Sequence, residues 1–362
     1  MRTPFKWPML QGGSLNLQSQ LGVDTIVTVR LPADRAYHQS RACWREHRVR
    51  FIVSPQQIIF RGDNIMRFKT VAILSPGDMG HAVGRALRQS ERRIITCLLG
   101  RSERSRGLAE AGGFELSPSL DDMVRDADIV LSILPPAAAM ATAEQVAAAM
   151  RATGQTPTYA DCNAISPDTT KAIGAVITAT GAAYIDAGIV GLPPGKQDRS
   201  TQFYVSGPDA EAFEDLNGHG IAVNALGPQI GQASAMKMCY AAITKGTWTL
   251  YTAALVTAET FGLTEAYMSE VEDSRPNVMA EMRSMVPRLP VDARRWIGEM
   301  EEISATFKSA GLPPGFHEGA ADVFRLLDRT PIAEETRETI DKSRTLEKAL
   351  SIFTDALNKP GS

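Results

Sequence analysis

The first segment able to bind a ligand lies just after residue 70, where an apolar run leads into a glycine-containing turn. Residues 71–74 have the length of a buried strand, and Ser75-Pro76-Gly77-Asp78-Met79-Gly80 follows them. A glycine at 77 lets backbone approach a pyrophosphate, and one at 80 lets a helix pack close to the strand. Free N–H groups at the helix start bind phosphate. The segment predicts a dinucleotide cradle, although Ser75 replaces the usual first glycine; the alternative is a strand–helix turn without a ligand.

The end of the next predicted strand bears on the choice of cofactor. The strand at 94–99 is followed by Arg101 and Ser102, with no acidic residue at its end. NAD sites usually have Asp or Glu there, whereas a guanidinium and a hydroxyl suit a 2′-phosphate. We therefore expect NADP(H) to be preferred and NAD(H) to remain possible; the competing interpretation is a solvated helix start. Leu134-Pro135-Pro136 ends a further strand and is expected to line the adenosine or pyrophosphate side.

Lys237 is the candidate proton carrier. The residues three and four positions away on a helix include Tyr240 and contain no acid, so no local ion pair holds the lysine at the surface. Burial lowers the pKa of a lysine, which can then take a hydroxyl proton as hydride leaves for a nicotinamide. The alternatives are a surface lysine on a long helix, Lys245 in the same role, or Tyr240 as the proton donor.

Polar residues after a later strand add a candidate substrate contact. Asn163 and Ser166 follow the strand predicted at 158–160, where substrate or nicotinamide contacts are usual. For Ser166 helix capping is favoured, since Pro167 follows at the first helical position. The four cysteines and five histidines have no metal-ligand spacing, so no metal is predicted.

These residues need an alternating α/β frame to position them. Apolar runs of strand length recur at 71–74, 94–99, 128–134, 158–160 and 183–189, and helical patterns lie between them. This alternation predicts βαβ units and a mainly parallel sheet. After residue 231 it stops, and residues 233–261 predict one long helix, with further helices broken at prolines 276, 287–290 and 313–314. The predicted fold class is an α/β Rossmann domain (66–230) followed by an all-α C-terminal domain (231–362).

Composition limits the classes of function. Of 362 residues, 44% are hydrophobic and 22% charged, as in globular proteins, and the net charge of −3 gives no reason to expect a nucleic-acid partner. No apolar run is long enough for a membrane span. The scattered cysteines predict reduced thiols and a cytoplasmic location.

Residues 1–65 differ from the rest of the chain. They hold nine basic residues against four acidic ones, and short β-like runs at 25–29 and 50–53. Three interpretations compete: upstream sequence included by a wrong start codon, a disordered or accessory arm, and a weak organelle-targeting peptide.

Four motifs, in order and spacing, resemble the β-hydroxyacid dehydrogenase family, which includes 3-hydroxyisobutyrate and 6-phosphogluconate dehydrogenases. They are Gly77-Asp78-Met79-Gly80, Asp161-Cys162-Asn163-Ala164-Ile165-Ser166-Pro167, Asp186-Ala187-Gly188-Ile189-Val190-Gly191 and residues 231–237. The resemblance implies a Rossmann domain joined by a long helix to a helical domain, a homodimer through the C-terminal helices, and nicotinamide-dependent oxidation of a β-hydroxy acid or its reverse. It implies that Lys237 is the catalytic lysine, and Asn163 resembles the asparagine of the phosphogluconate branch.

The sequence departs from that family around the substrate. The usual S-G-G loop is Val190-Gly191-Leu192 here, and Tyr240 stands where a polar residue follows the lysine. We therefore expect Gly191, Leu192 and Lys245, with Asn163, to contact a larger or less polar small-molecule substrate. The alternatives are an imine-reductase-like NADPH-dependent C=N reductase, which the retained Lys237 disfavours, and a non-catalytic NADPH-binding redox sensor.

Overall fold

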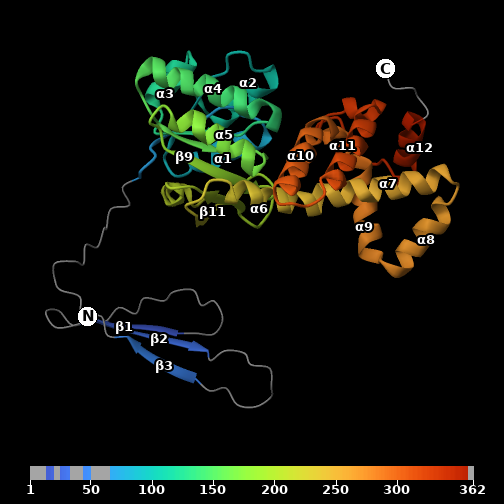
Figure 1. Ribbon diagram of the computed structural model, residues 1–362, viewed down its shortest axis with the longest axis horizontal. Helices are drawn as coiled ribbons and strands as arrows, with labels where there is room; N and C mark the ends of the chain where they lie inside the picture. The colour runs from blue at the N-terminus through green and yellow to red at the C-terminus, as the bar shows by residue number, and fades with distance from the viewer. Residues whose placement is uncertain (1–13, 20–24, 33–43, 50–65, 358–362) are drawn as a thin grey trace. The chain divides into compact units, whose positions relative to one another are not determined.

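The computed structural model describes residues 14–19, 25–32, 44–49 and 66–357, and the chain divides into two units after residue 65. In the first unit, β1 (Ser14–Ser19), β2 (Thr25–Pro32) and β3 (Trp44–Val49) form an antiparallel sheet (Figure 1). The strand predicted at 25–29 is part of β2, whereas that at 50–53 and Cys43 lie outside the described residues. The three interpretations of residues 1–65 stay predictions.

The second unit begins with an eight-stranded sheet, in the order β11-β10-β9-β8-β7-β4-β5-β6. Neighbours from β9 to β6 are parallel, β10 is antiparallel to β9, and β11 is parallel to β10. The strands are β4 (Thr70–Ile73), β5 (Arg93–Thr96), β6 (Glu115–Leu116), β7 (Ile129–Ser132), β8 (Thr158–Asp161), β9 (Tyr184–Val190), β10 (Thr201–Ser206) and β11 (Ile221–Gly227). The mainly parallel sheet predicted from the alternation is confirmed.

Helices cover both faces of this sheet, because successive side chains of each strand point to opposite faces. Val71 and Ile73 of β4 pack in the same core as α1, whereas Ala72 and Leu74 join the core of α3, α4 and α5. The helices are α1 (Asp78–Arg88), α2 (Glu103–Gly112), α3 (Leu120–Asp126), α4 (Pro136–Thr153), α5 (Pro167–Thr178) and the 3₁₀ helix η1 (Ala210–Leu216). The strands β4, β5, β7, β8 and β9 are therefore buried on two sides, which explains their apolar runs.

Three strands, β6, β10 and β11, were not predicted. β6 has only two residues, and β10 and β11 follow residues 191–200, which are rich in glycine, proline and polar residues and interrupt the pattern. Burial alternates along the first four residues of β10, with Thr201 and Phe203 buried and Gln202 and Tyr204 partly exposed, as expected near a sheet edge. The strands that are evident from the sequence are those buried along nearly all of their length.

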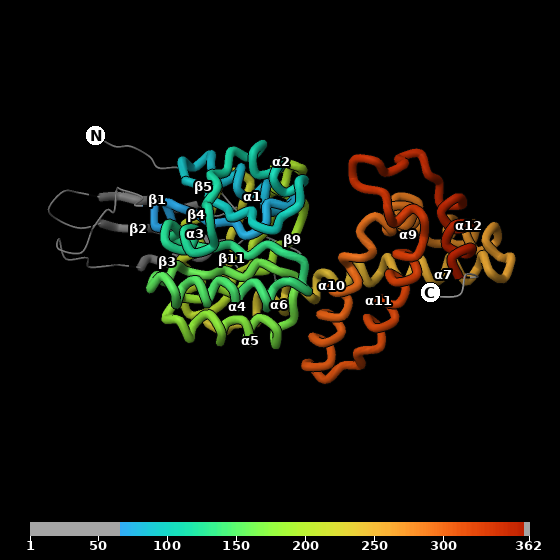
Figure 2. The backbone as a smooth tube through the Cα atoms, turned by 90° about the horizontal axis from the view of Figure 1, so that it is seen from above, coloured from blue at the N-terminus to red at the C-terminus, as the bar shows by residue number. Residues whose placement is uncertain are grey.

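The rest of the second unit is helical (Figure 2). Proline opens α9 and α10, and the Pro313-Pro314 pair precedes α11, so the predicted breaks fall where helices begin. The helices are α6 (Gln232–Ala241), the π-helical turn η2 (Ala242–Gly246), α7 (Thr247–Thr260), α8 (Thr264–Ser274), α9 (Pro276–Met285), η3 (Val286–Arg288), α10 (Pro290–Ser309), α11 (Gly315–Asp328), η4 (Pro331–Glu334) and α12 (Leu346–Leu357). The predicted fold class, a Rossmann domain followed by helices, is confirmed.

The single long helix predicted at 233–261 is wrong at one place. A five-residue π-helical turn, Ala242–Gly246, separates α6 from α7 without a break in the helical path. The turn contains β-branched Ile243 and Thr244 and ends at Gly246, where a Cβ would lie 2.8 Å from the His317 Nε2 of α11. Side-chain periodicity alone does not distinguish one π turn from a continuous α-helix.

No helix within the described residues is long and apolar enough to cross a membrane.

Candidate active site

The turn between β4 and α1 has the shape of a phosphate cradle. A Cβ added at Gly80 would lie 2.2 Å from the Ser75 carbonyl oxygen, so only glycine allows α1 to start this close to the strand. Gly77 is the N-cap of α1, makes no side-chain cap and has no atom within 4 Å of an added Cβ. Pro76 is buried beside it, and Met79 packs on the core. The open side at Gly77 and the free N–H groups of α1 fit a pyrophosphate.

Asp78, in the first turn of α1, holds two arginine side chains next to the cradle. Its carboxylate pairs with Arg104 of α2 at 2.6 Å and with Arg337 of the segment before α12 at 3.5 Å. Arg104 also contacts Glu338 at 3.2 Å. Because two guanidinium groups flank Asp78, their positive charges compensate the negative charge of its carboxylate next to the helix terminus.

Arg101 and Ser102 lie where the sequence places them, between β5 and α2. Ser102 is the N-cap of α2, and its hydroxyl accepts a hydrogen bond from the Ser105 amide at 3.3 Å. Arg101 is partly exposed, and within residues 66–357 its side chain makes no ion pair. Its guanidinium is thus available to an anion, whereas the Ser102 hydroxyl already has a structural role.

Asn163 connects the ends of β7 and β8 by hydrogen bonds. Its Oδ1 accepts a hydrogen bond from the Leu134 amide at 2.5 Å, and its Nδ2 donates to the Ser132 hydroxyl at 2.9 Å. Its own amide donates to Asp161 Oδ1 at 3.0 Å. Asn163 is almost fully buried, so it holds the segment that leads into Pro135 and α4.

Asp161, at the end of β8, is a buried acid. Burial, assisted by the nearby Asp186 carboxylate, raises its pKa to about 7 against the opposing effect of the hydrogen bond from the Asn163 amide. Its Oδ2 has no hydrogen-bond partner in the described part of the chain. The carboxyl group of Asp161 is therefore removed from water, and electrostatic interactions close to it are stronger than in solvent.

Asp186 of β9 anchors the helix that carries Lys237. Its Oδ2 accepts hydrogen bonds from the amides of Gly231 at 2.8 Å and Ser234 at 3.2 Å, and its Oδ1 from the Ser234 hydroxyl at 2.6 Å. A carboxylate is favourable at this helix terminus, because it satisfies free N–H groups and the helix dipole. Asp186 therefore sets where α6 starts and how it is turned.

Lys237 is partly exposed by side-chain area yet surrounded closely enough to lose most of its hydration. Burial lowers its pKa to about 8; the charges of Lys245 and Arg295 act in the same direction, and Glu299 opposes them. An amine with this pKa exchanges protons near neutral pH. Lys237 therefore shares its electrostatic environment with a second lysine, Lys245.

Lys245 lies in the π turn and forms a buried ion pair with Glu299 of α10. Its Nζ also lies 5.5 Å from the centre of the Trp296 ring. In a continuous α-helix a residue eight positions after Lys237 would be rotated about 80° away. The π turn acts as a one-residue insertion, which reduces this angle to about 20°. The turn therefore puts both lysines on one face.

Glu299 is held between positive groups. Burial alone would raise its pKa, but Lys245, Lys237 and Arg295 together keep it below the ordinary value for a glutamate. Arg295 Nη1 lies 3.8 Å from its Oε1. The cluster thus contains one buried carboxylate and three cations.

α10 also brings this cluster to the sheet. A Cβ added at Gly298 would lie 4.0 Å from the Pro136 Cβ at the start of α4. Glu302, one turn further, accepts hydrogen bonds from the Ser166 amide at 2.7 Å and the Thr169 hydroxyl at 2.9 Å. Ser166 caps α5, as the sequence predicts. Through Gly298 and Glu302, α10 therefore packs against the starts of α4 and α5, which follow β7 and β8.

Three predicted residues lie outside this cluster. Gly191 has φ of +107°, which favours glycine, and Leu192 is 55% exposed. Tyr240 is one turn beyond Lys237 but 39% exposed, and its hydroxyl makes no hydrogen bond within residues 66–357.

Glu299, Glu302 and the anchoring role of Asp186 were missed by the sequence reasoning. Glu299 did carry a signal, since it interrupts the apolar stripe of Trp296, Met300 and Ile303 on α10. An acid on the buried face of a helix requires a partner, here Lys245. Among the described residues no cluster of His, Cys, Asp or Glu could hold a metal ion.

Two family models match the chain. The NAD binding domain of 6-phosphogluconate dehydrogenase matches residues 70–218, and a domain of unknown function (DUF1932) matches residues 258–327. The first covers the sheet from β4 to η1, and the second covers α8 to α11 with the end of α7.

Similar proteins extend over both parts. An uncharacterized 28.5 kDa protein of Methanothermus fervidus is 25% identical over 222 residues, 61% of this chain and 84% of that protein. A solved conserved protein of unknown function, described as structurally similar to 3-hydroxyacid dehydrogenases, is 26% identical with a TM-score of 0.54, covering 71% of this chain and 96% of its own. The 3-hydroxyisobutyrate dehydrogenase of Mycobacterium tuberculosis, at 18% identity and a TM-score of 0.55, shares the fold and covers 80% of this chain and 99% of its own.

Proposed function

The chain belongs to the β-hydroxyacid dehydrogenase family and is an oxidoreductase with a nicotinamide-binding domain, and on this premise we propose that it transfers hydride between NADP(H) and a CH–OH group, with Lys237 as the proton carrier. When bound, the nicotinamide accepts or supplies the hydride. In the oxidative direction the neutral Lys237 amine takes the hydroxyl proton of the substrate; in the reductive direction its ammonium returns a proton to the carbonyl oxygen.

The observation that carries this proposal is the packing of Lys237 against Gly188 of β9, close to the Lys245–Glu299 pair; this environment lowers the pKa of Lys237 to about 8. A surface lysine would stay protonated near pH 7 and could not act as a base. In this arrangement the charge of Lys245 helps to lower the pKa of Lys237. We therefore assign Lys245 a supporting role in proton transfer and keep it as a proposed substrate contact. Tyr240, being exposed, is the second candidate for the proton donor.

The cofactor would lie along the end of the sheet. Residues 75–80 would hold its pyrophosphate, because Gly77 is open and the α1 amides are free. Arg101 would bind a 2′-phosphate, with Ser102 beside it, and NAD(H) would bind less well. Leu134, Pro135 and Pro136 would line the path towards Lys237.

The substrate would enter from the side of the β9–β10 loop. Asn163 has a second Nδ2 hydrogen that its bond to Ser132 leaves available. At the start of this loop, Gly191 and Leu192 supply no hydroxyl group. A less polar hydroxy acid therefore fits these residues better than a sugar acid.

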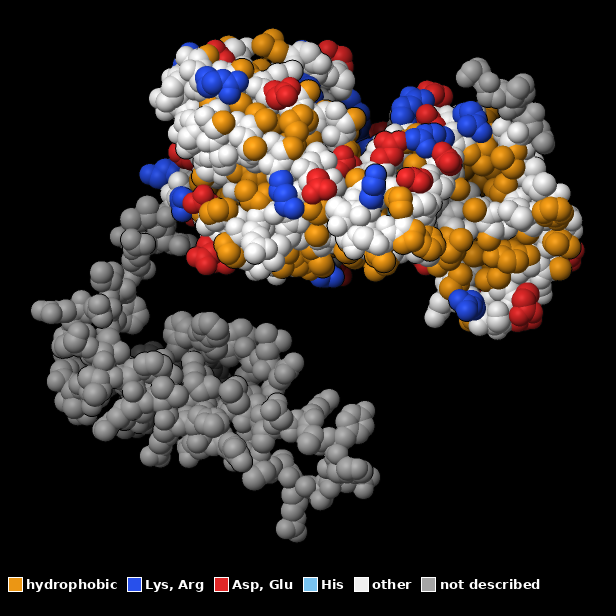
Figure 3. Space-filling model, in the orientation of Figure 1, with side chains coloured by type: hydrophobic (Ala, Val, Ile, Leu, Met, Phe, Trp, Pro, Cys, Tyr) orange, Lys and Arg blue, Asp and Glu red, His pale blue; other side chains and the backbone are white. Residues whose placement is uncertain are grey.

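A homodimer through the C-terminal helices is the second part of the proposal. Ile243, Leu250 and Phe261 are 71%, 66% and 73% exposed along the η2–α7 path, and Figure 3 shows hydrophobic side chains gathered over α7 to α9. Large apolar side chains in one stripe are typical of a covered face. Sedimentation at micromolar concentration should give a dimer, and a monomer would contradict it.

A substrate panel read by NADPH absorbance tests the function. Aliphatic and aryl β-hydroxy acids should be oxidised faster than simple alcohols. Turnover of cyclic imines alone would support the imine-reductase-like alternative, and NADPH binding without turnover would support the redox sensor. The cytoplasmic location stays a prediction from the cysteines.

A further inference from the structure

His317, in the first turn of α11, is a buried histidine with no part in the proton transfer described above. It is 7% exposed. Its ring packs edge-on against the Phe307 ring of α10, with 4.6 Å between the ring centres. The Ser304 hydroxyl of α10 also donates a hydrogen bond to the Pro314 carbonyl at 3.2 Å, just before α11. The imidazole is therefore fixed against α10, the helix that carries Glu299.

Another edge of the ring faces the π turn η2. A Cβ added at Gly246 would lie 2.8 Å from the His317 Nε2, so the turn approaches the ring as closely as glycine allows. Burial lowers the pKa of His317, and a hydrogen bond between the imidazole and the Ala242 backbone opposes this. The Nδ1 has no hydrogen-bond partner in the described part of the chain. These surroundings fit a neutral ring with its proton on Nε2, because a proton on Nδ1 would be buried without an acceptor.

The carbonyl groups around the π turn find partners in side chains. A π turn lengthens the backbone hydrogen bonds from four residues to five and so disturbs the usual pairing of carbonyl groups. The Thr244 hydroxyl donates to the carbonyls of Tyr240 and Ala241, at 3.2 Å in each case. That partner belongs to the turn itself, whereas the partner at Ala242 comes from α11. His317 therefore connects the turn to a neighbouring helix.

The place of the turn decides where Lys245 points. The extra residue must be accommodated between α6, whose start is fixed by Asp186, and α7, which packs in the helical core. If it were accommodated beyond Lys245, an α-helical path would rotate Lys245 about 80° away from the face of Lys237. The contact of His317 with Gly246 lies at the turn, so it fixes the extra residue at 242–246.

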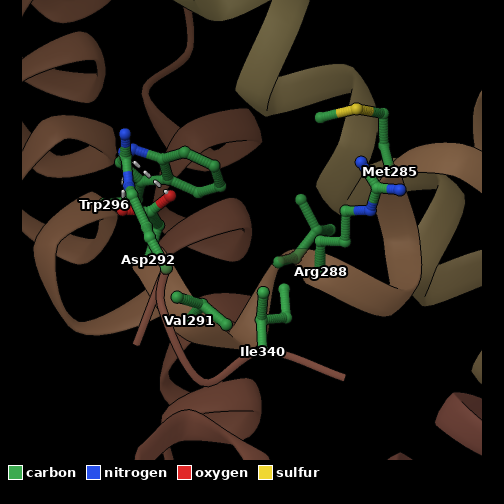
Figure 4. A pocket seen from close by; sticks show the side chains of 8 residues that line it. Met285, Arg288, Val291, Asp292, Trp296 and Ile340 are labelled. Carbon is green, nitrogen blue, oxygen red and sulfur yellow. Dashed lines mark hydrogen bonds and ion pairs between the residues drawn. The ribbon is translucent and has the colours of Figure 1, made fainter. Parts of the chain in front are cut away.

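Lys245 has its partners on α10. Its ammonium pairs with Glu299, and its Nζ lies 5.5 Å from the centre of the Trp296 ring. The ring packs against Phe324 of α11, with 5.4 Å between the ring centres. It separates Lys245 from a small cavity, shown in Figure 4 with Met285 on the opposite side. Both partners are buried in the helical core, so Lys245 keeps them only while the turn stays in place.

We propose that His317 is a positioning residue for proton transfer: it holds the π turn at residues 242–246 and thereby keeps Lys245 where its charge acts on Lys237. This inference rests on the proposed function and deepens it, since it gives the proton-carrying site a residue of α11 that acts through the turn. The charged groups that act on Lys237 are Lys245, Glu299 and Arg295. A change at His317 should therefore reach Lys237 through Lys245.

The reactivity of the Lys237 amine tests this role without a substrate. Acetic anhydride reacts with the neutral amine, so the rate of trace acetylation near pH 7, read at Lys237 by mass spectrometry, follows its pKa. His317→Leu and Lys245→Met should each slow acetylation about threefold or more, because less of the amine is neutral when its pKa rises. His317→Gln keeps an N–H at the same end of the side chain and should stay near the wild-type rate. The control Phe353→Leu, buried on α12 in the same helical core, should lower the free energy of unfolding and leave the rate unchanged.

A double variant shows whether His317 acts through Lys245. In the Lys245→Met background, His317→Leu should slow acetylation no further, because the charge that it displaces is already gone. Gly246→Ala, whose methyl group would press on the His317 ring, should slow acetylation too and repeats the test if His317→Leu fails to fold.

An unchanged rate in folded His317→Leu, or an equal further slowing in the Lys245→Met background, would overturn the positioning role. If acetylation responds as expected but no hydroxy acid is oxidised, the proposed function fails and the positioning role stands. Oxidation of a hydroxy acid with acetylation unchanged in the His317 variants gives the reverse.

Discussion

Gly188 of β9 lies directly against Lys237 of α6: a Cβ added at 188 would come within 2.8 Å of the Lys237 Cβ and equally close to the Ala233 carbonyl oxygen. Lys237 can pack directly against β9 because Gly188 has no side chain. Together with the Asp186 carboxylate at the start of α6, this contact fixes both the height and the rotation of the helix.

Gly188→Ala should displace α6, because one of the atoms in the way belongs to the backbone and cannot rotate aside. We expect a loss of roughly 1–3 kcal/mol in the free energy of unfolding and a lower kcat with cofactor affinity unchanged. Denaturant unfolding and steady-state kinetics measure the two effects. Gly181→Ala, in an open turn with positive φ, should destabilise through its backbone alone and leave kcat intact. Equal kcat in the two variants would contradict the positioning role of Gly188.

The phosphate cradle gives a paired prediction. Gly77→Ala meets no atom within 4 Å and should cost less than about 1 kcal/mol as an N-cap change, yet its methyl group would occupy the pyrophosphate side and weaken NADPH binding about tenfold or more. Gly80→Ala clashes with the Ser75 carbonyl oxygen and should lower stability first. Thermal unfolding and NADPH titration separate the two. Normal NADPH affinity in Gly77→Ala would place the pyrophosphate elsewhere.

Cofactor choice depends on Arg101. We expect the wild type to bind NADPH more tightly than NADH, and Arg101→Asp to reverse the order, because a charge-assisted bond worth roughly 1.5–3 kcal/mol is lost and repulsion is added. Arg85→Asp, at the far end of α1, makes the same charge change away from the ribose and should leave the order intact. Equal affinities of the wild type for both cofactors would refute this assignment.

The Lys245–Glu299 pair should tune the pKa of Lys237 in opposite directions. In the oxidative direction kcat/KM should rise with pH through about 8, as Lys237 loses its proton. Lys245→Met removes a charge that lowers the pKa of Lys237, so the rise should move to higher pH. Glu299→Gln removes a charge that raises this pKa, so the rise should move lower. The double variant should return towards the wild type, and single variants with unmoved profiles would show that the pair does not act on Lys237.

The sequence was sufficient for the frame of the sheet but not for its edge. The apolar runs of β4, β5, β7, β8 and β9 are buried on both faces and therefore unmistakable. β10 and β11 are partly exposed and follow a loop rich in glycine and proline, so their pattern is weak.

The candidate site was likewise predictable only in part. The cradle at Gly77 and Gly80 and the lysine on α6 are visible because local spacing specifies them. Glu299 and Arg337 lie tens of residues away and reach the site through packing of α10 and the segment before α12, which one sequence does not reveal. The π turn that aligns Lys245 with Lys237 is likewise a tertiary feature.

The central claim is that Lys237 carries the proton. Its most direct test is the pH dependence of kcat/KM for Lys237→Ala beside Tyr240→Phe, on one oxidised hydroxy acid. Lys237→Ala should fold, bind NADPH normally and lose about 10²–10⁴-fold in turnover, and the rise through a pKa of about 8 should disappear. Tyr240→Phe should keep that rise and most of the rate. A near-normal Lys237→Ala together with a disabled Tyr240→Phe would contradict the account and favour the imine-reductase-like chemistry.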